Sequence, residues 1–197
     1  RATEGPFTMQ PLYRYIVGFY HWLFGQSVFA QNIADIWCIL GAAFIIAFFA
    51  AKFRVSASII FIACITYFSI NLIGAFRYHL GKGLTESHAM IFLVLCAWFL
   101  YKAREGGTKP IVLATLFGIF GYWTRIDHLG AVVCVAFLLL EPVNGPTGGW
   151  KDYWGRLQLE WKKFAIYWGF GIISVLLICF RNWSLGGAFF VSNINHA

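Results

Sequence analysis

A ten-residue stretch, residues 121–130, constrains the fold more than any other part of the sequence. It reads Gly-Tyr-Trp-Thr-Arg-Ile-Asp-His-Leu-Gly and separates two apolar runs, residues 111–120 and 131–140. Each run is shorter than the ~20 residues that a transmembrane helix needs. One helix through both runs would place an arginine and an aspartate in hydrocarbon, which costs about 3 kcal/mol for each unpaired charge. We therefore predict a turn that brings Arg125, Asp127 and His128 to one membrane surface.

The composition is that of a membrane protein. Hydrophobic residues make up 60% of the chain and charged residues only 12%, far from the averages of soluble domains. We predict an all-α, polytopic transmembrane helical bundle with about six spans and one interfacial amphipathic helix. The formal net charge of +7 fits cytoplasmic loops and lipid headgroups, so we expect membrane lipids, and no nucleic acid, as partners.

Apolar runs and polar breaks divide the chain into three parts. Residues 1–32 read as the end of an external loop, in which the aromatic-rich residues 12–24 fit an interfacial helix. Residues 33–181 form the transmembrane domain, and residues 182–197 begin another external loop. The predicted spans are residues 33–51, 55–76, 88–101, 110–124, 127–140 and 164–180.

Lysine and arginine are concentrated in alternate loops. The loops at residues 52–54, 102–109 and 141–163 share one side of the membrane, and the positive-inside rule makes them cytoplasmic. The last loop is predicted to contain a short amphipathic helix at its end. The outer face then collects charges of both signs, namely Glu4, Arg14, Asp35, Arg77, His79, Lys82, Glu86, His88, Arg125, Asp127, His128 and Arg181.

Charges of both signs at an outer membrane face suit the transfer of a group from a lipid phosphate to an acceptor. Cations hold the phosphate and stabilise it as it leaves, and a carboxylate takes the proton of the acceptor. The structural alternative is a simple ion pair between Arg125 and Asp127, with the other cations anchored to headgroups. The candidate phosphate-binding residues are Arg77, Lys82, Arg125 and Arg181, and the candidate catalytic acids are Glu86 and Asp127.

Histidine and cysteine give no pattern of a cofactor site. The weak candidates for a metal are His79, His88 and His128, which form no helical i, i+4 pair. No histidine pair lies mid-span on facing helices, so haem or chlorophyll ligation is not predicted either. The five cysteines lie inside apolar runs without a C-x-x-C pair and are interpreted as small packing residues.

Four motifs, in chain order, resemble those of C-type (GT-C) polytopic membrane glycosyltransferases, the relatives of protein O-mannosyltransferases and of the aminoarabinose transferase of lipid A. The segment from Gln10, Gln-Pro-Leu-Tyr-Arg-Tyr-Ile-Val-Gly, with Leu-Phe-Gly-Gln-Ser from Leu23, is similar to the end of the family's first large external loop. Leu-Thr-Glu-Ser-His-Ala-Met from Leu84 is similar to its short acidic motif. Residues 118–129 resemble its outer turn, and Arg-Asn-Trp from Arg181 resembles the opening of its next external loop.

The resemblance implies roles for several residues. Members of this family move a sugar from a polyprenyl-phosphate donor to an acceptor on the outer (periplasmic or lumenal) face, by an inverting displacement at the sugar carbon. By position, Glu86 is the family's second acidic residue in the active cavity. Arg125 and Arg181 face the donor phosphate or the cavity rim, and Asp127 orients Arg125.

The sequence departs from the family at its start. The principal base of the family precedes the first residue here, and Met9 and Gln10 stand where some members carry a metal-binding glutamate and a lysine. Because Arg1 opens the sequence without an initiator methionine, we expect an internal part of a longer chain. The predicted function is the central transmembrane part of a lipid-linked-sugar glycosyltransferase. The alternative is a non-catalytic structural or accessory subunit of a larger membrane complex, glycosyltransferase-like in fold.

Overall fold

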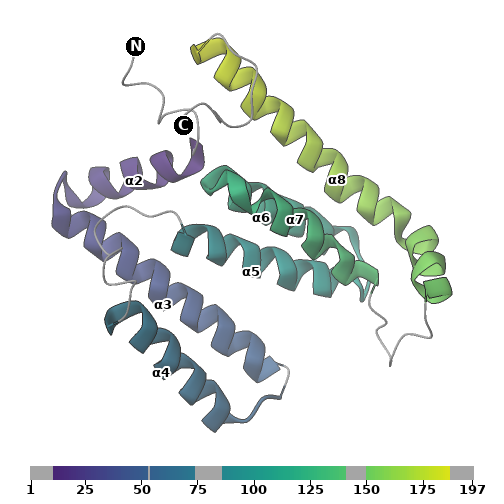
Figure 1. The fold of residues 1–197 in the computed structure, drawn as a ribbon, viewed down its shortest axis with the longest axis horizontal. Coiled ribbons are helices and arrows are strands. Elements are labelled where there is room, and N and C mark those ends of the chain that lie inside the picture. Colours follow the sequence, from purple (N-terminus) through teal and green to yellow (C-terminus); the bar gives the residue numbers. More distant parts are fainter. Residues whose placement is uncertain (1–10, 53, 74–85, 141–149, 187–197) are drawn as a thin grey trace.

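The computed structural model describes residues 11–52, 54–73, 86–140 and 150–186, and this part of the chain is helical, without β-strands (Figure 1). The prediction of an all-α fold is therefore confirmed for the described residues. The elements are α2 (Pro11–Phe24), α3 (Val28–Lys52), α4 (Ala57–Ile73), α5 (Glu86–Ala103), α6 (Thr108–Thr124), η2 (Ile126–His128), α7 (Leu129–Val135), η3 (Ala136–Leu140) and α8 (Trp150–Gly186).

Helices α3, α4 and α5 lie side by side and alternate in direction. α4 returns along α3 after a short connection, as Figure 1 shows. α5 then runs in the same direction as α3. The side chain of Ile91, near the start of α5, lies 3.6 Å from the position of a Cβ on Gly41, in the middle of α3. Near their ends Phe49 stacks on Trp98, with ring centroids 4.3 Å apart.

The alternation continues through α6 and α8. α6 runs opposite to α5, because Phe117 stacks on Phe99 while Gly121, further along α6, lies beside the start of α5. α8 also runs opposite to α5. Its Lys163 bonds to the carbonyl of Ala103, and its Tyr167 lies beside the earlier residue Cys96. Helices that follow one another in the sequence thus alternate in direction, and the returning arm of α7 and η3 separates α6 from α8 in the chain, which run the same way.

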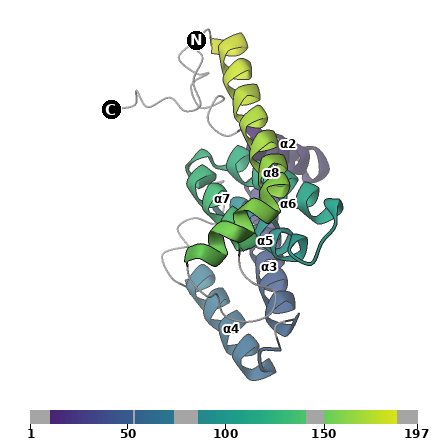
Figure 2. The same ribbon diagram turned by 90° about the vertical axis from the view of Figure 1, so that its right-hand side faces the viewer.

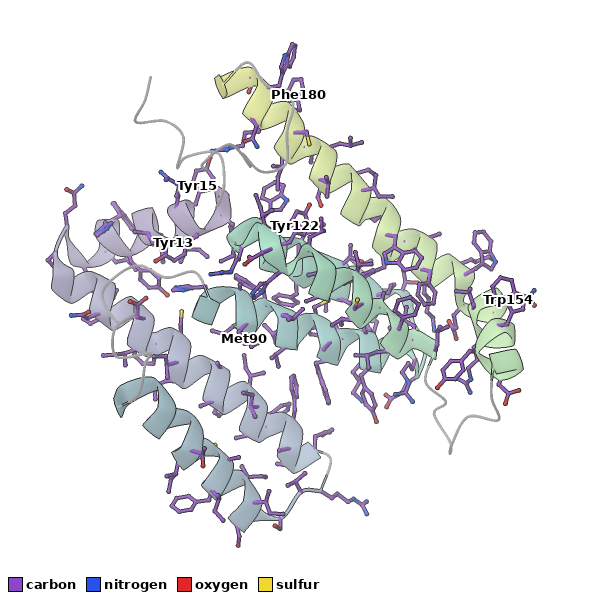
Figure 3. All side chains as sticks on the ribbon, in the orientation of Figure 1. Tyr13, Tyr15, Met90, Tyr122, Trp154 and Phe180 are labelled. Atoms are coloured by element: carbon purple, nitrogen blue, oxygen red, sulfur yellow. The ribbon has the colours of Figure 1, made fainter. Side chains whose placement is uncertain are left out.

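The alternating directions separate two sets of charged side chains. We call the region around α2 and the start of α5 the α2 end, and the region around the last turn of α5 the opposite end. The helices and turns that carry them place Arg14, Asp35, His88, Arg125, Asp127 and Arg181 at the α2 end. At the opposite end lie Lys52, Lys102, Arg104 and Lys163. Figure 3 shows how far apart the two ends are, with Tyr13 of α2 at one end and Trp154 of α8 at the other.

The core combines large side chains with small residues at the helix contacts. α5 is central, with α3 on one side and α6, α7 and η3 on the other (Figures 1 and 2). Small side chains let the backbones of membrane helices approach closely. A Cβ on Gly118 would lie only 3.0 Å from the hydroxyl of Tyr167. The buried core residues are Cys96, Leu100, Ala103, Ile111, Ala114, Tyr122, Val132, Ala136, Leu139, Leu140, Phe164, Tyr167 and Ile178.

Large apolar side chains cover the outside of the bundle, which is the reverse of a soluble fold. α4 exposes Ile59, Phe61 and Ile62, and α8 exposes a long series that includes Ile172 and Phe180. Figure 3 shows side chains that project away from the helices on several sides, Phe180 of α8 among them. Together with the apolar helices, this surface supports association with a membrane.

Two of the described helices are long and apolar enough to cross a membrane, over Asp35–Lys52 and Asp152–Ser184. The prediction of about six spans is therefore met only in part. α5 and α6 have 18 and 17 residues, which is the lower limit for a span, and the span predicted at 127–140 is divided between η2, α7 and η3. The shorter apolar helices are Ala57–Thr66, His88–Ala103 and Ile126–Leu140.

Helix α8 is longer than the sequence indicates. Its 37 residues include much of the predicted loop at 141–163 and the first residues of the predicted external loop at 182–197. The polar residues that indicated a loop are compatible with a helix, because lysine, glutamate and glutamine have good helix propensity and no proline interrupts them. Lys163, for example, pairs with Glu160 one turn earlier at 2.7 Å.

Candidate functional site

The predicted turn at residues 121–130 is present. α6 ends at Thr124, and Arg125 is extended, with φ −149° and ψ 109°. The chain then re-enters helical structure through η2 and returns along α6. Gly118 and Val132, which lie at equal distances in sequence on either side of Arg125, come together, since a Cβ on Gly118 would lie 3.1 Å from the side chain of Val132. A single helix through this region is therefore excluded.

Arg125 and Asp127 form an ion pair within this turn. The Nε atom of Arg125 lies 2.8 Å from the carboxylate oxygens of Asp127. The side chain of Arg125 is 27% exposed and that of Asp127 is 59% exposed, so water screens the pair and its contribution to folding is small. The predicted role of Asp127 in orienting Arg125 agrees with this contact, and so does the purely structural interpretation.

His128 completes the turn and ends η2. Its Nδ1 atom is buried and has no hydrogen-bond partner among the described residues. Its neighbour Leu129 begins α7 and packs against the core of the bundle. The imidazole is thus placed between the charged turn and the apolar interior.

Two further cations, from opposite ends of the sequence, lie at the α2 end. Arg14 on α2 and Arg181 on α8 are separated by most of the sequence, yet burial, and then the guanidinium of Arg181, lower the pKa of Arg14 below its usual value. Two guanidinium groups whose charges influence each other in this way would both be stabilised by an anion nearby. Arg181 also donates to the side-chain oxygen of its fully buried neighbour Asn182 at 3.3 Å.

A third group of polar side chains is buried under α2. The ring of Tyr13 lies edge-on to His88, with centroids 5.2 Å apart, and both residues are almost fully buried. Asp35 on α3 is also buried, with 6% of its surface exposed. Burial, and then the nearby Cys38 and Asp35, raise the pKa of Tyr20 on the same helix α2.

A cavity of about 460 Å³ lies beside this group, between α2, α3 and α5. Its walls are mainly aromatic, and the imidazole of His88 is one of its few polar parts. Figure 3 shows Tyr15 on α2, at the α2 end of the bundle. The lining residues are Tyr15, Ile16, Phe19, Tyr20, Cys38, His88, Ile91 and Phe92.

Several predicted site residues have no described side chain. Arg77, His79 and Lys82 lie outside the described residues. Glu86 is the first residue of α5 and so belongs to the α2 end, but only its helical backbone is described. The structure therefore brings Arg125 and Asp127 together and places Arg181 beside Arg14, and it leaves the other predicted contacts open.

No metal site is formed by the part of the chain that the structure describes, because no three His, Cys, Asp or Glu side chains gather there. Of the three candidate histidines, His88 lies under Tyr13 and His128 lies in the turn. The five cysteines are free thiols, as their interpretation as packing residues requires.

Two residues of this site had no functional assignment from the sequence. Arg14 was predicted as part of an interfacial helix and, like Asp35, as a charge of the outer face, and neither was given a role. A charged residue inside an otherwise aromatic or apolar helix was the available signal in both cases.

No protein-family model, curated protein or solved structure matches the chain.

Proposed function

We propose that this is a multi-pass membrane protein with about six spans and that α2 is its interfacial helix. The alternating directions of α3 to α8 and the apolar outer surface support this topology. Helices shorter than the bilayer are accommodated by local thinning or by polar residues that reach the interface. In this proposal the opposite end, which carries Lys52, Lys102 and Lys163, faces the cytoplasm.

We propose further that the α2 end binds a polyprenyl-phosphate sugar donor and that the protein acts as the transmembrane part of a glycosyltransferase. The presence of Arg14, Arg125 and Arg181 at the same end of the bundle carries this proposal. These guanidinium groups come from three separate elements, and each can bind phosphate oxygens in a bidentate manner. A phosphate at a membrane surface is the ligand that such a group of cations fits best.

The proposed chemical step assigns a role to each of these residues. An acceptor hydroxyl or amine attacks the sugar carbon, the bond from that carbon to the phosphate oxygen breaks, and the lipid phosphate leaves with the bonding electrons. Arg125, Arg181 and Arg14 neutralise the charge that develops on the phosphate. Glu86, at the start of α5, takes the proton of the acceptor, and Asp127 holds Arg125 in place.

Lipid binding by the purified full-length protein tests the donor site. Undecaprenyl phosphate and undecaprenol have the same chain and differ only in the phosphate, so their Kd values in lipid nanodiscs isolate its contribution. We expect the phosphate to bind at least 10-fold more tightly, and Arg125→Gln or Arg181→Gln to remove most of this difference. Lys52→Gln, at the opposite end, is the matched control and should leave both Kd values unchanged.

Transfer of a radiolabelled sugar tests catalysis. Membranes that contain the full-length protein receive undecaprenyl-phosphate-linked sugars, and the label that leaves the donor lipid is counted. We expect Glu86→Ala and Arg125→Ala to abolish transfer while the amount of folded protein stays the same. Full transfer by both variants would contradict the site. Phosphate-dependent lipid binding without any transfer by the wild-type protein would instead favour the accessory-subunit alternative.

A further inference from the structure

A second cavity, of about 470 Å³, forms a groove between the α6–α7 hairpin and α8. Its floor is buried and contains Thr115, Tyr122 and Val132. Its rim faces outward, with Val133 42% exposed and Ile172 62% exposed. The groove therefore opens on the surface that we assign to lipid. The remaining lining residues are Ile119, Leu129, Tyr167, Trp168, Gly171, Val175 and Leu176.

The polar atoms of the floor are already bonded within the protein. The hydroxyl of Thr115 donates to the carbonyl of Ile111 at 2.8 Å. The hydroxyl of Tyr122 bonds to Ser174 and accepts from Trp123. The floor therefore presents mainly apolar surface. In the wall of the groove, the buried Nε1 of Trp168 has no hydrogen-bond partner among the described residues. A lining that is apolar apart from such isolated polar atoms suits a hydrocarbon.

The dimensions of the groove fit one chain. On α8 the lining extends from Tyr167 to Leu176, which is a length of about 13 Å at the rise of an α-helix. An elongated apolar groove of this length suits a single hydrocarbon chain that lies along the helix.

The groove is continuous with the charged turn. Leu129 lines the groove and directly follows His128, and Tyr122 lines it one turn before Arg125. A lipid with its chain in the groove would therefore have its headgroup at Arg125. In the sequence, His128 stands between Arg125 and Leu129, and its buried Nδ1 has no partner among the described residues.

We infer that the groove between α6, α7 and α8 binds the first isoprene units of the polyprenyl phosphate whose headgroup lies at Arg125. This inference rests on the proposed function and adds where the chain of the donor lies. A groove that holds the chain in one place positions the phosphate and the sugar carbon relative to the acids of the α2 end.

Two glycines of α8 give a matched test. A Cβ on Gly171, in the groove, or on Gly169, which does not line it, would meet no atom within 4 Å. Phenylalanine can therefore replace either glycine without a clash at the backbone, and only Gly171→Phe fills the groove. A second matched pair guards against misfolding. Ile172 and Ile173 are both exposed, and only Ile172 lines the groove, so Ile172→Trp is compared with Ile173→Trp.

The probes are undecaprenyl phosphate, undecaprenol and the diacyl lipid phosphatidylglycerol, each measured with the full-length protein in nanodiscs. We expect Gly171→Phe and Ile172→Trp to weaken binding of both undecaprenyl probes at least 10-fold and to leave phosphatidylglycerol unaffected. Gly169→Phe and Ile173→Trp should behave as the wild type. Unchanged undecaprenyl binding by both groove variants, or no binding of either probe by the wild type, would overturn the inference.

The same data separate this inference from the proposed function. Arg125→Gln changes only the phosphate-dependent part of the affinity, whereas the groove variants also change the affinity for undecaprenol. If the groove variants weaken undecaprenol while Arg125→Gln has no effect, the groove stands and the proposed donor site fails. If the groove variants weaken phosphatidylglycerol alone, the groove is a site for diacyl lipid, and the inference fails.

Discussion

The hydroxyl of Tyr167, on α8, donates a hydrogen bond of 2.9 Å to the main-chain carbonyl of Val132, on α7. The thiol of Cys96, on α5, lies 3.1 Å from the same hydroxyl and acts as the donor, because the single hydroxyl proton already serves Val132. α7 ends three residues later, where the N–H of Ala136 bonds to Cys134. One tyrosine thus joins three helices at the position where the returning arm of the hairpin loses regular α-helical bonding.

Tyr167→Phe should destabilise the protein by about 1–3 kcal/mol, because a buried carbonyl and a buried thiol lose their partner. Unfolding of the full-length protein in mixed micelles by denaturant measures this difference. Tyr15→Phe is the control, because the side chain of Tyr15 is exposed, and its free energy of unfolding should stay within ~0.5 kcal/mol of the wild type. Equal stability of the two variants would mean that the three-helix contact is absent in solution.

Gly118→Ala should also destabilise, through overpacking. The new Cβ would lie 3.0 Å from the hydroxyl of Tyr167, 3.1 Å from Val132 and 3.3 Å from Cys96. Such crowding in a packed core costs about 1–3 kcal/mol. Gly130→Ala is the control, because its Cβ would meet nothing within 4 Å and alanine favours the helix by up to ~1 kcal/mol. The two substitutions should therefore shift the melting temperature in opposite directions.

Arg125→Ala and Asp127→Ala should leave the melting temperature almost unchanged. The pair is partly exposed to solvent, and exposed ion pairs contribute about 0.2–1 kcal/mol. Binding of undecaprenyl phosphate should nevertheless fall, more for Arg125→Ala than for Asp127→Ala, because aspartate only positions the guanidinium. A large loss of stability in either variant would support the interpretation of the pair as a structural contact.

Cysteine labelling in sealed vesicles should reveal the topology. In a variant without its five natural cysteines, Gln26→Cys, between α2 and α3, should react with a membrane-impermeant maleimide from the outer side. Thr108→Cys, at the start of α6, should react only after the vesicles are opened, because it lies at the opposite end. Reaction of both positions from one side would contradict the alternating arrangement of the spans.

The hairpin could be predicted from the sequence because its cause is local. Two apolar runs, each too short for a span, flank a segment with Arg125 and Asp127, and the cost of burying charge leaves a turn as the cheaper solution. The pairing of Gly118 with Val132 then follows from symmetry about Arg125. The same reasoning explains why the helical class and the approximate positions of α2, α3 and α5 were predicted.

Contacts between distant segments could not be predicted in this way. Nothing near Arg14 indicates that Arg181 lies beside it, because that proximity depends on how α8 crosses the whole bundle. The start of α8 was missed for a different reason. The polar residues after Trp150 resemble a loop in hydropathy, whereas their helix propensity is good, and propensity together with the contact between Lys163 and Ala103 decides the outcome.

The unbroken course of α8 has a mechanical consequence. At the usual rise, its 37 residues measure about 55 Å, which exceeds the ~40–45 Å of a whole bilayer with its headgroups. In the proposed membrane topology the helix is therefore long enough to reach past both membrane surfaces, even though its first part runs at an angle to the rest (Figure 2). Because no loop interrupts α8 between Trp150 and Arg181, a movement at one end of the helix would then be passed to the other through continuous helical backbone.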